Sequence, residues 1–197
     1  MEDRLKNQPR ILLINDMAGY GKVALSVMIP VFSHMKYETF NLPTVLISNT
    51  LDYGNFDILD TTEYMQNTLR VWNELQFSFD AICTGFIVSE RQASLVYEYC
   101  KEQRKKGHVI KTSCTKFEMK DIADRLHELG AKAVVITSAN IDGKMITVVK
   151  NSLHSEMTLI PYEEIPVRFP GTGDVFMAIV VGHYLRSGKL SESVQTA

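Results

Sequence analysis

The amino-acid sequence predicts an α/β fold with a mainly parallel central sheet flanked by helices. Short apolar runs alternate with longer amphipathic segments along most of the chain. Strands that alternate with helices of this length are typical of βαβ units, in which helices cover both faces of a parallel sheet. The chain has 197 residues, 45% of them hydrophobic and 22% charged, which is an ordinary composition for a globular domain with a sizeable core.

The predicted strands are short and rich in aliphatic residues, and they cover residues 11–14, 45–47, 81–84, 109–110, 133–137 and 145–149. The predicted helices carry apolar residues at helical spacing and cover residues 23–35, 62–75, 89–106, 119–129 and 174–187, with a further helix start at 190–196. Ser89 and Gln92 have the spacing of a capping box at one helix start. Gly107, Gly130 and Gly188 stand where helices are expected to end.

Composition excludes several classes of function. The formal net charge of −2 gives no electrostatic case for nucleic-acid binding, and no apolar run approaches the ~20 residues that span a membrane. The polar N-terminus has no signal-peptide core. Cys83, Cys100 and Cys114 lack CxxC spacing, which predicts a reducing, cytoplasmic setting without disulfides or a zinc site. The scattered histidines suggest no metal site.

The segment Phe169-Pro170-Gly171-Thr172-Gly173-Asp174 is the most informative stretch of the chain, because an apolar helical run follows it directly. Glycines let the backbone turn and approach a ligand closely. The first helical turn has unpaired N–H groups and partial positive charge, so it forms an anion site. A carboxylate beside that site is suited to accept a proton from an attacking group. The alternative interpretation is that Asp174 only caps its own helix.

A segment of small residues with a carboxylate, Asp16, follows the first predicted strand, and we expect a ligand-binding loop there. Gly19, Gly21 and Ala24 partly match a dinucleotide fingerprint, with Glu38 as the distal ribose acid, but the match is weak because the glycines fall several residues past the strand. A phosphate-binding P-loop is excluded because its four-residue spacer and following Ser or Thr are missing.

Polar clusters also follow the next two predicted strands. Residues 48–54 offer hydroxyls, an amide and the ring of Tyr53, and residues 84–86 include Phe86. In parallel sheets, ligands bind beyond the carboxyl ends of the strands. We therefore expect these loops and the glycine-rich helix entry to meet at one crevice.

The chain resembles the pyridoxal/pyridoxamine (vitamin B6) kinase group of the ribokinase-like superfamily. The resemblance extends over about residues 10–110 and 117–196. It rests on segments 11–16, 42–49, 53–54, 79–86 and 169–176. The GTGD segment at 171–174 indicates the superfamily, and the LPT…SN…YG and TGF segments indicate the B6 kinase branch.

The resemblance implies a ribokinase-like three-layer sandwich that phosphorylates the 5′-hydroxymethyl group of pyridoxal, pyridoxamine or pyridoxine with ATP and Mg²⁺. It makes Asp174 the catalytic base and the N–H groups around Gly171, Thr172 and Gly173 an anion hole for the transferring phosphoryl group. The substrate pocket that it implies is lined by Asp16, Gly19, Ser48, Tyr53 and Phe86. The resemblance also suggests a homodimer. Phosphoryl transfer depends mainly on positioning and charge neutralisation, which agrees with these roles.

The sequence also departs from the family pattern. Thr50 and Leu51 follow the Ser-Asn pair where the family usually has histidine and threonine, and Phe86 stands where tyrosine is common. The acidic segments that surround Mg²⁺ in the family are absent, so no metal ligand is assigned. We therefore expect residues 1–197 to form a single kinase domain that is incomplete, with a segment missing near residues 110–115 and the C-terminal part absent.

Three alternatives to a B6 kinase stay open at this point. A hydroxymethylpyrimidine kinase has the same GTGD arrangement with a different ring pocket. A non-catalytic protein could keep the B6 pocket without the nucleotide machinery. The weakest alternative is an NAD-dependent Rossmann-type protein built on Gly19 and Gly21.

Overall fold

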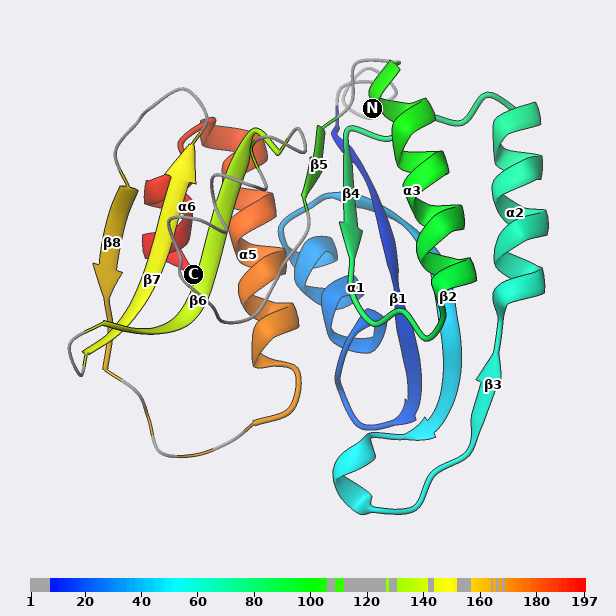
Figure 1. Cartoon of the computed structure of the whole chain (residues 1–197), viewed down its shortest axis with the longest axis horizontal. Helices are drawn as coiled ribbons and strands as arrows, with labels where there is room; N and C mark the ends of the chain where they lie inside the picture. Colours follow the sequence, from blue (N-terminus) through cyan, green and yellow to red (C-terminus); the bar gives the residue numbers. More distant parts are fainter. Residues whose placement is uncertain are drawn as a thin grey trace. The chain divides into compact units, whose positions relative to one another are not determined.

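The computed structural model describes residues 8–105, 109–111, 127, 131–141, 144–151, 157–163, 165, 167 and 169–197. The chain forms two compact units (Figure 1), the first made of Met1–Ile110 with Pro170–Ala178 and the second of Lys111–Phe169 with Ile179–Ala197. A single domain over residues 1–197 stays a prediction. The missing segment expected near 110–115 lies outside the described residues beyond Lys111, as does the helix predicted over 119–129 apart from His127.

The first unit contains a five-stranded sheet of order β3-β2-β1-β4-β5. Its strands are β1 (Arg10–Tyr20), β2 (Glu38–Asn49), β3 (Ile58–Asp60), β4 (Ala81–Thr84) and β5 (Val109–Lys111). Strand β1 pairs in parallel with β2 and β4, as expected, whereas β3 is antiparallel to β2. The sheet is therefore mixed, not uniformly parallel. The connection from β2 to β3 is too short for a crossover and permits only antiparallel pairing.

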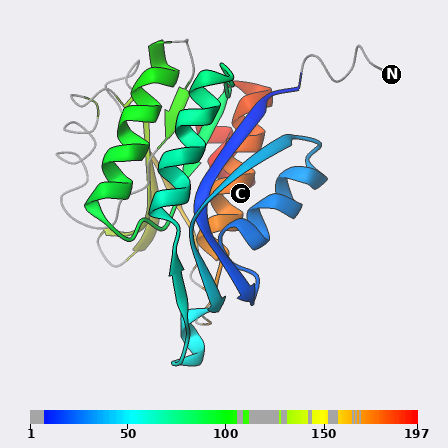
Figure 2. The same cartoon turned by 90° about the vertical axis from the view of Figure 1, so that its right-hand side faces the viewer.

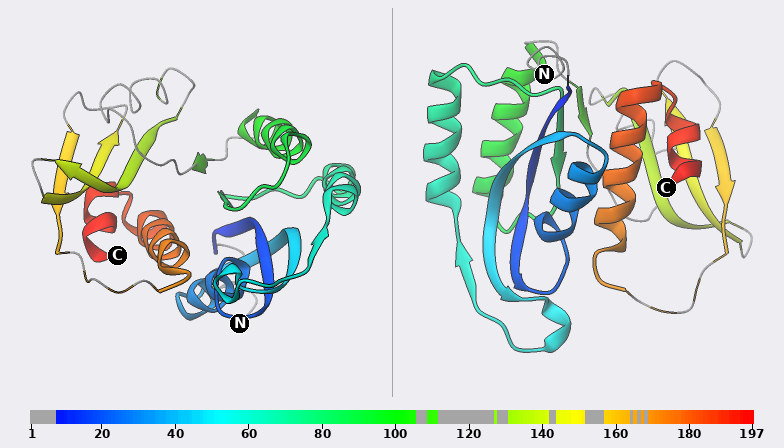
Figure 3. Two further views of the ribbon diagram at one scale, coloured as in Figure 1. Left: turned by 60° about the horizontal axis from the view of Figure 1, so that its bottom comes forward. Right: turned by 180° about the vertical axis from the view of Figure 1, so that it is seen from behind.

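Helices cover both faces of this sheet (Figures 2 and 3). Helix α1 (Leu25–His34) packs on β1 and β2, and α2 (Thr62–Glu74) and α3 (Glu90–Lys105) lie on the opposite face. Side chains of a strand alternate between faces, so the aliphatic residues of β1 contribute to both layers. The core on the α2 and α3 side consists of Leu12, Ile14, Leu42, Met65, Leu69, Phe79, Ile82, Val96, Tyr99 and Cys100.

The second unit contains a three-stranded sheet of order β6-β7-β8. Its strands are β6 (Ala133–Ile141), β7 (Lys144–Asn151) and β8 (Met157–Pro161), and each pairs antiparallel with its neighbour. The strands predicted at 133–137 and 145–149 are confirmed as strands, but they form a hairpin because only two residues separate β6 from β7. Helix α6 (Leu190–Thr196), predicted as a helix start, packs on β7.

Helix α5 (Thr172–Ser187) begins two residues before the predicted start, and its first turn belongs to the first unit. Within the described part of the chain, every helix is too short or too polar to cross a membrane. The cysteines described there, Cys83 and Cys100, are buried and form no disulfide.

The capping box predicted at the start of α3 is only half formed. The Gln92 backbone N–H donates to Ser89 Oγ at 3.2 Å, as predicted. The Gln92 side chain is fully buried and does not return to Ser89; its Nε2 donates to the Thr44 carbonyl at 2.8 Å and to Thr62 Oγ1 at 3.0 Å. Buried carbonyls need partners, so Gln92 joins α3 to β2.

Tyr99 predicts a pH dependence of folding stability. Burial raises the pKa of its hydroxyl to about 12, above the value of ~10 for a tyrosine in an unfolded chain. The unfolded state loses this proton first, so the contribution of Tyr99 is complete below pH ~10 and is lost as the pH rises toward 12. We expect the free energy of unfolding, measured in denaturant, to fall less between pH 10 and 12 in Tyr99→Phe than in the wild type.

The matched control is Tyr97→Phe, which removes a hydroxyl from a tyrosine on the same helix that is 63% exposed. Its stability should follow the wild-type pH curve. Parallel curves for the wild type and Tyr99→Phe would show that burial of the Tyr99 hydroxyl does not control stability at high pH.

Candidate active site

Strand β1 brings a buried polar pair to the carboxyl half of the sheet. Four fully buried aliphatic residues, 11–14, are followed by Asn15 and Asp16, which are 2% and 8% exposed. The ligand loop expected after Ile14 is absent, because β1 continues to pair with β2 as far as Tyr20. The register shifts between Asn15 and Met17, and such a bulge re-aims side chains. The polar pair therefore stands on a strand and not on a loop.

Gly19 permits the extension of this strand pair. A Cβ on Gly19 would lie 2.9 Å from the Ser48 carbonyl oxygen of β2, which is too close for any side chain. Gly21 has φ +106° and turns the chain toward α1. The dinucleotide fingerprint is contradicted by this geometry, because Gly19 lies inside a strand. Glu38 starts β2 beside Arg10, at the amino edge of the sheet, where it cannot serve as the distal ribose acid.

The side-chain amide of Asn15 uses all its hydrogen-bonding positions. Its Oδ1 accepts the backbone N–H groups of Asp16 at 3.0 Å and Phe86 at 2.7 Å. Its Nδ2 donates to Asp174 Oδ1 at 3.2 Å and to Met28 Sδ at 3.7 Å. Two backbone donors on one side and a carboxylate on the other fix the orientation of the amide. One side chain therefore joins β1, α5 and the segment after β4.

Asp174 lies in the first turn of α5 and is half-buried. Its Oδ2 accepts the backbone N–H of Ala24 at 2.9 Å, and its Oδ1 accepts Asn15 Nδ2. Both partners lie outside α5, so the carboxylate does more than cap its own helix. A carboxylate has about four acceptor positions, and two are used here. The role of Asp174 as a general base stays a prediction.

The turn before α5 depends on Gly171. It has φ +86°, and a Cβ there would lie 2.7 Å from the Lys22 carbonyl oxygen. Only glycine allows this approach between the start of α5 and the turn after β1. Thr172 and Gly173 follow as exposed residues of the first helical turn. That Gly171, Thr172 and Gly173 form an anion site for a phosphoryl group stays a prediction.

Asp16 lies close enough to Asp174 for their charges to interact. Burial raises the pKa of the Asp16 carboxyl, and repulsion from Asp174 adds to the shift. A raised carboxyl pKa beside a second carboxylate is more frequent at functional sites than elsewhere. Within the described residues, no group of three or more His, Cys, Asp or Glu residues could hold a metal ion.

Phe86 is held by hydrogen bonds on both sides of its peptide. Its N–H donates to Asn15, and its carbonyl accepts from Thr44 Oγ1 at 2.7 Å. Its side chain is 42% exposed. Gly85 makes room for this arrangement, because a Cβ there would lie 2.2 Å from the Asn15 amide atoms. The structure therefore brings Asp16, Phe86 and Asp174 together around Asn15.

Ser48 and Tyr53 are not joined to this group by any hydrogen bond or ring contact of the described residues. The exposed Ser48 hydroxyl donates to Asn49 Oδ1 at 2.7 Å and accepts the Asp57 N–H at 2.9 Å. Tyr53 lies in the 3₁₀ helix η2 (Leu51–Tyr53), and its ring meets the Tyr20 ring edge-on at 5.4 Å between centroids. The segment between β2 and β3, which contains η2, extends beyond the ends of α2 and α3 (Figure 2). Substrate contacts by Gly19, Ser48 and Tyr53 stay predictions.

Sequence reasoning missed Asn15, Gly85, Ala24 and Thr44 as parts of the site. Asn15 carried a usable signal, because an amide directly after four aliphatic strand residues is expected to be buried and to need partners. Ala24 acts through its backbone N–H, Thr44 through its hydroxyl and Gly85 through its lack of a side chain. Their positions in the sequence give no such signal.

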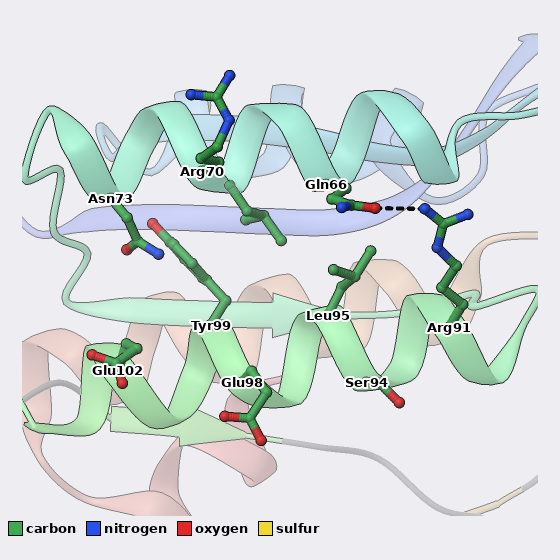
Figure 4. A pocket seen from close by; sticks show the side chains of 10 residues that line it. Gln66, Arg70, Asn73, Arg91, Ser94, Leu95, Glu98, Tyr99 and Glu102 are labelled. Carbon is green, nitrogen blue, oxygen red and sulfur yellow. Dashed lines mark hydrogen bonds between the residues drawn. The ribbon is translucent and has the colours of Figure 1, made fainter.

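A separate groove of about 370 Å³ lies between α2 and α3 (Figure 4). Tyr99 and Leu95 extend from α3 toward α2, and Leu69, Arg70 and Glu98 are among the other residues that line the groove. None of the residues predicted for catalysis or substrate binding lines it. The candidate active site is therefore at the carboxyl half of β1 and not in this groove.

Several solved structures are similar to this chain. A protein from Bacteroides thetaiotaomicron assigned as a phosphomethylpyrimidine kinase, in a crystal form with pyridoxal, is 24% identical with TM-score 0.84, covering 96% of this chain and 84% of that one. Pyridoxal kinase from Lactobacillus plantarum is 18% identical with TM-score 0.77, covering 94% and 84%. Pyridoxal kinase from Leishmania donovani, with ADP and pyridoxine, is 17% identical with TM-score 0.73, covering 94% and 85%.

Gly85 gives a direct test of the packing around Asn15. Gly85→Ala places a methyl group 2.2 Å from the Asn15 amide atoms, and overpacking of this kind costs about 1–3 kcal/mol. We expect the free energy of unfolding to fall by that amount in denaturant titrations. The matched control is Gly173→Ala, because a Cβ on Gly173 meets nothing within 4 Å. Equal stability of the two variants would contradict the close contact at Gly85.

No family model matches the sequence. The resemblance found in the sequence is nevertheless confirmed at the level of fold by the solved structures, whose identities to this chain are low. The chain has the ribokinase-like α/β fold, which it shares with pyridoxal kinases and with a protein assigned as a phosphomethylpyrimidine kinase.

Proposed function

We propose that this protein is a small-molecule kinase that transfers the γ-phosphoryl group of ATP to the 5′-hydroxymethyl group of a B6 vitamer. The observation that carries the proposal is the carboxylate of Asp174, held at the start of α5 by Asn15 and Ala24. Support comes from structural neighbours that are pyridoxal kinases, including one solved with ADP and pyridoxine.

In the proposed reaction, the substrate hydroxyl oxygen attacks the γ-phosphorus and the bond to the β-phosphate oxygen of ATP breaks, releasing ADP. Asp174 accepts the hydroxyl proton through the acceptor positions that its hydrogen bonds leave available. The first-turn N–H groups around Gly171, Thr172 and Gly173 neutralise charge on the transferring phosphoryl group. Because these groups are fixed by the backbone, they need no rearrangement during transfer.

The substrate ring is proposed to lie against Phe86, whose backbone is fixed on both sides and whose side chain is partly exposed. Asp16 supplies a polar group beside it. In kinase sites Mg²⁺ is held largely by substrate phosphates with one or two carboxylates, and the oxygen donors of Asp16 are of the kind that it prefers. When bound with ATP, the ion would neutralise phosphate charge. A homodimer and a cytoplasmic location stay predictions.

A hydroxymethylpyrimidine is the second candidate substrate. It is favoured by the Bacteroides thetaiotaomicron neighbour, which is assigned as a phosphomethylpyrimidine kinase but was solved with pyridoxal. Both substrates present a hydroxymethyl group on a nitrogen heterocycle, so the base and the anion site serve both equally. Contacts at the ring separate them.

The first experiment offers pyridoxal, pyridoxamine, pyridoxine and hydroxymethylpyrimidine separately with ATP, and detects the phosphorylated product by mass spectrometry. We expect ATP-dependent product with a B6 vitamer at a higher kcat/KM than with the pyrimidine. The reverse order would favour the second candidate. Pyridoxal binding in calorimetry without product from any acceptor would indicate a non-catalytic B6-binding protein.

Asp174→Asn tests the assigned base. General-base assistance contributes about 10²–10⁴-fold in rate, so we expect kcat to fall by that factor while the equilibrium binding of pyridoxal changes little. The amide can accept only one of the two hydrogen bonds that the carboxylate accepts, which also costs about 1–3 kcal/mol of stability. Activity is therefore normalised to the folded fraction.

The control is Glu98→Gln, which neutralises a carboxylate on the outer face of α3 that is 64% exposed. It should retain wild-type kcat. If Asp174→Asn also retains most of its kcat per folded molecule, Asp174 is not the base and the glycine-rich turn is only the start of a helix.

A further inference from the structure

We propose that Asn15 is a positioning residue for this reaction, which holds the base Asp174 at a fixed place relative to the backbone of the substrate pocket. This role rests on the proposed kinase function. It concerns a residue that contacts neither the vitamer nor ATP in the proposed arrangement. It acts through the two groups that its amide binds.

The geometry of the amide carries this proposal. Its Nδ2 end donates to Asp174 Oδ1 at 3.2 Å, and its Oδ1 end accepts the Phe86 N–H at 2.7 Å. An amide is planar and rigid, and that of Asn15 is 2% exposed. One rigid group therefore holds the Asp174 carboxylate at one end and the Phe86 peptide at the other. In the proposed reaction, the first accepts the proton and the ring of the second contacts the substrate.

The backbone of Gly85 packs directly against this amide, because a Cβ on Gly85 would lie 2.2 Å from the Asn15 amide atoms. Aspartate has the same size as asparagine but cannot donate to Asp174 when ionised. Alanine has neither a donor nor an acceptor in its side chain. The asparagine amide supplies both a donor and an acceptor within this space.

Asp174 is held from a second direction by the Ala24 N–H at 2.9 Å. Ala24 has φ 48°, a value that is uncommon for a residue with a side chain. Such conformations are concentrated at functional sites, where the surroundings hold them in place. The two donors bind different oxygens of the carboxylate and so prevent its rotation. Removal of the Asn15 donor leaves one support, around which the carboxylate can turn.

A purely structural role for Asn15 makes a different prediction. In that case its amide only satisfies buried polar groups, and activity per folded molecule follows stability. A positioning role predicts that kcat stays low even when packing is restored. The two roles are separated by variants that change the hydrogen bond and the packing independently.

Asn15→Asp keeps the size of the side chain and the acceptor for the Phe86 and Asp16 N–H groups, but replaces the donor to Asp174 with an oxygen. We expect kcat to fall about 10- to 100-fold, as for small displacements of a reacting group, while KM for the vitamer stays within about threefold. An unchanged kcat would overturn the positioning role.

The double variant Asn15→Ala/Gly85→Ala restores packing without the amide, because the added methyl group occupies space that the amide leaves. We expect its thermal unfolding to occur closer to the wild-type temperature than that of Asn15→Ala, with kcat as low as in the single variant. Recovery of kcat together with stability would assign Asn15 a structural role only.

Gln103→Ala is the matched control, because Gln103 is another fully buried amide, and its Nε2 donates to the Phe77 carbonyl away from the site. It should lower stability and keep wild-type kcat per folded molecule. A wild-type protein without turnover of any acceptor would overturn the proposed function and this role together. Full kcat in Asn15→Asp, in an active protein, would overturn this role alone.

Discussion

The arrangement of the candidate site depends on burying one side-chain amide with every hydrogen-bonding position used. Leaving a buried polar group without a partner costs about 1–3 kcal/mol, so each partner of Asn15 is constrained by the others. The strand bulge at Asn15 turns the amide toward Asp174 and Phe86. The absence of a side chain at Gly85 makes the space. If any of these fails, the buried Asn15 amide loses partners.

The carboxylate of Asp174 connects this buried network to the surface. Its helix begins directly after Gly171, whose backbone approaches the turn that follows β1. The same turn presents the Ala24 N–H to the carboxylate. Helix α1 therefore begins with its first donor directed at a protein carboxylate and not toward a ligand. This is a second reason why Gly19 and Gly21 do not form a dinucleotide site, even though their spacing partly resembles one.

The sequence predicted most reliably those elements whose bounds are set by adjacent residues. Strand β4 was predicted over residues 81–84 and has those bounds, because a short, mainly apolar run lies between Asp80 and Gly85. The helix entry at Gly171 was likewise predicted from adjacent residues. Residues 15–20 of β1 and 38–44 of β2 were missed, because small and polar residues there are held by backbone pairing, which leaves no side-chain pattern. Strand β3 was missed because all three of its residues are exposed.

The contacts of Asn15 could not be predicted for a different reason. Its partners Phe86 and Asp174 lie 71 and 159 positions away in the sequence, so only the fold brings them together. Ser48 has partners that the sequence does not reveal: its hydroxyl bonds to Asn49 and to the Asp57 N–H, and its contact with the substrate stays a prediction. A polar residue after an apolar run indicates that a partner is needed but does not say which.

The electrostatics of the site give a reason for an amide at position 15. Asp16 and Asp174 are close enough to repel, which contributes to the raised pKa of Asp16. The Asn15 amide presents its positive end to the Asp174 carboxylate and its negative end to the Asp16 N–H. The amide therefore binds Asp174 while adding no net charge to a region with two carboxylates. A lysine or arginine would bring a positive charge beside Asp174, and a third carboxylate would increase the repulsion. A neutral donor anchors Asp174 and leaves the net charge of this region unchanged.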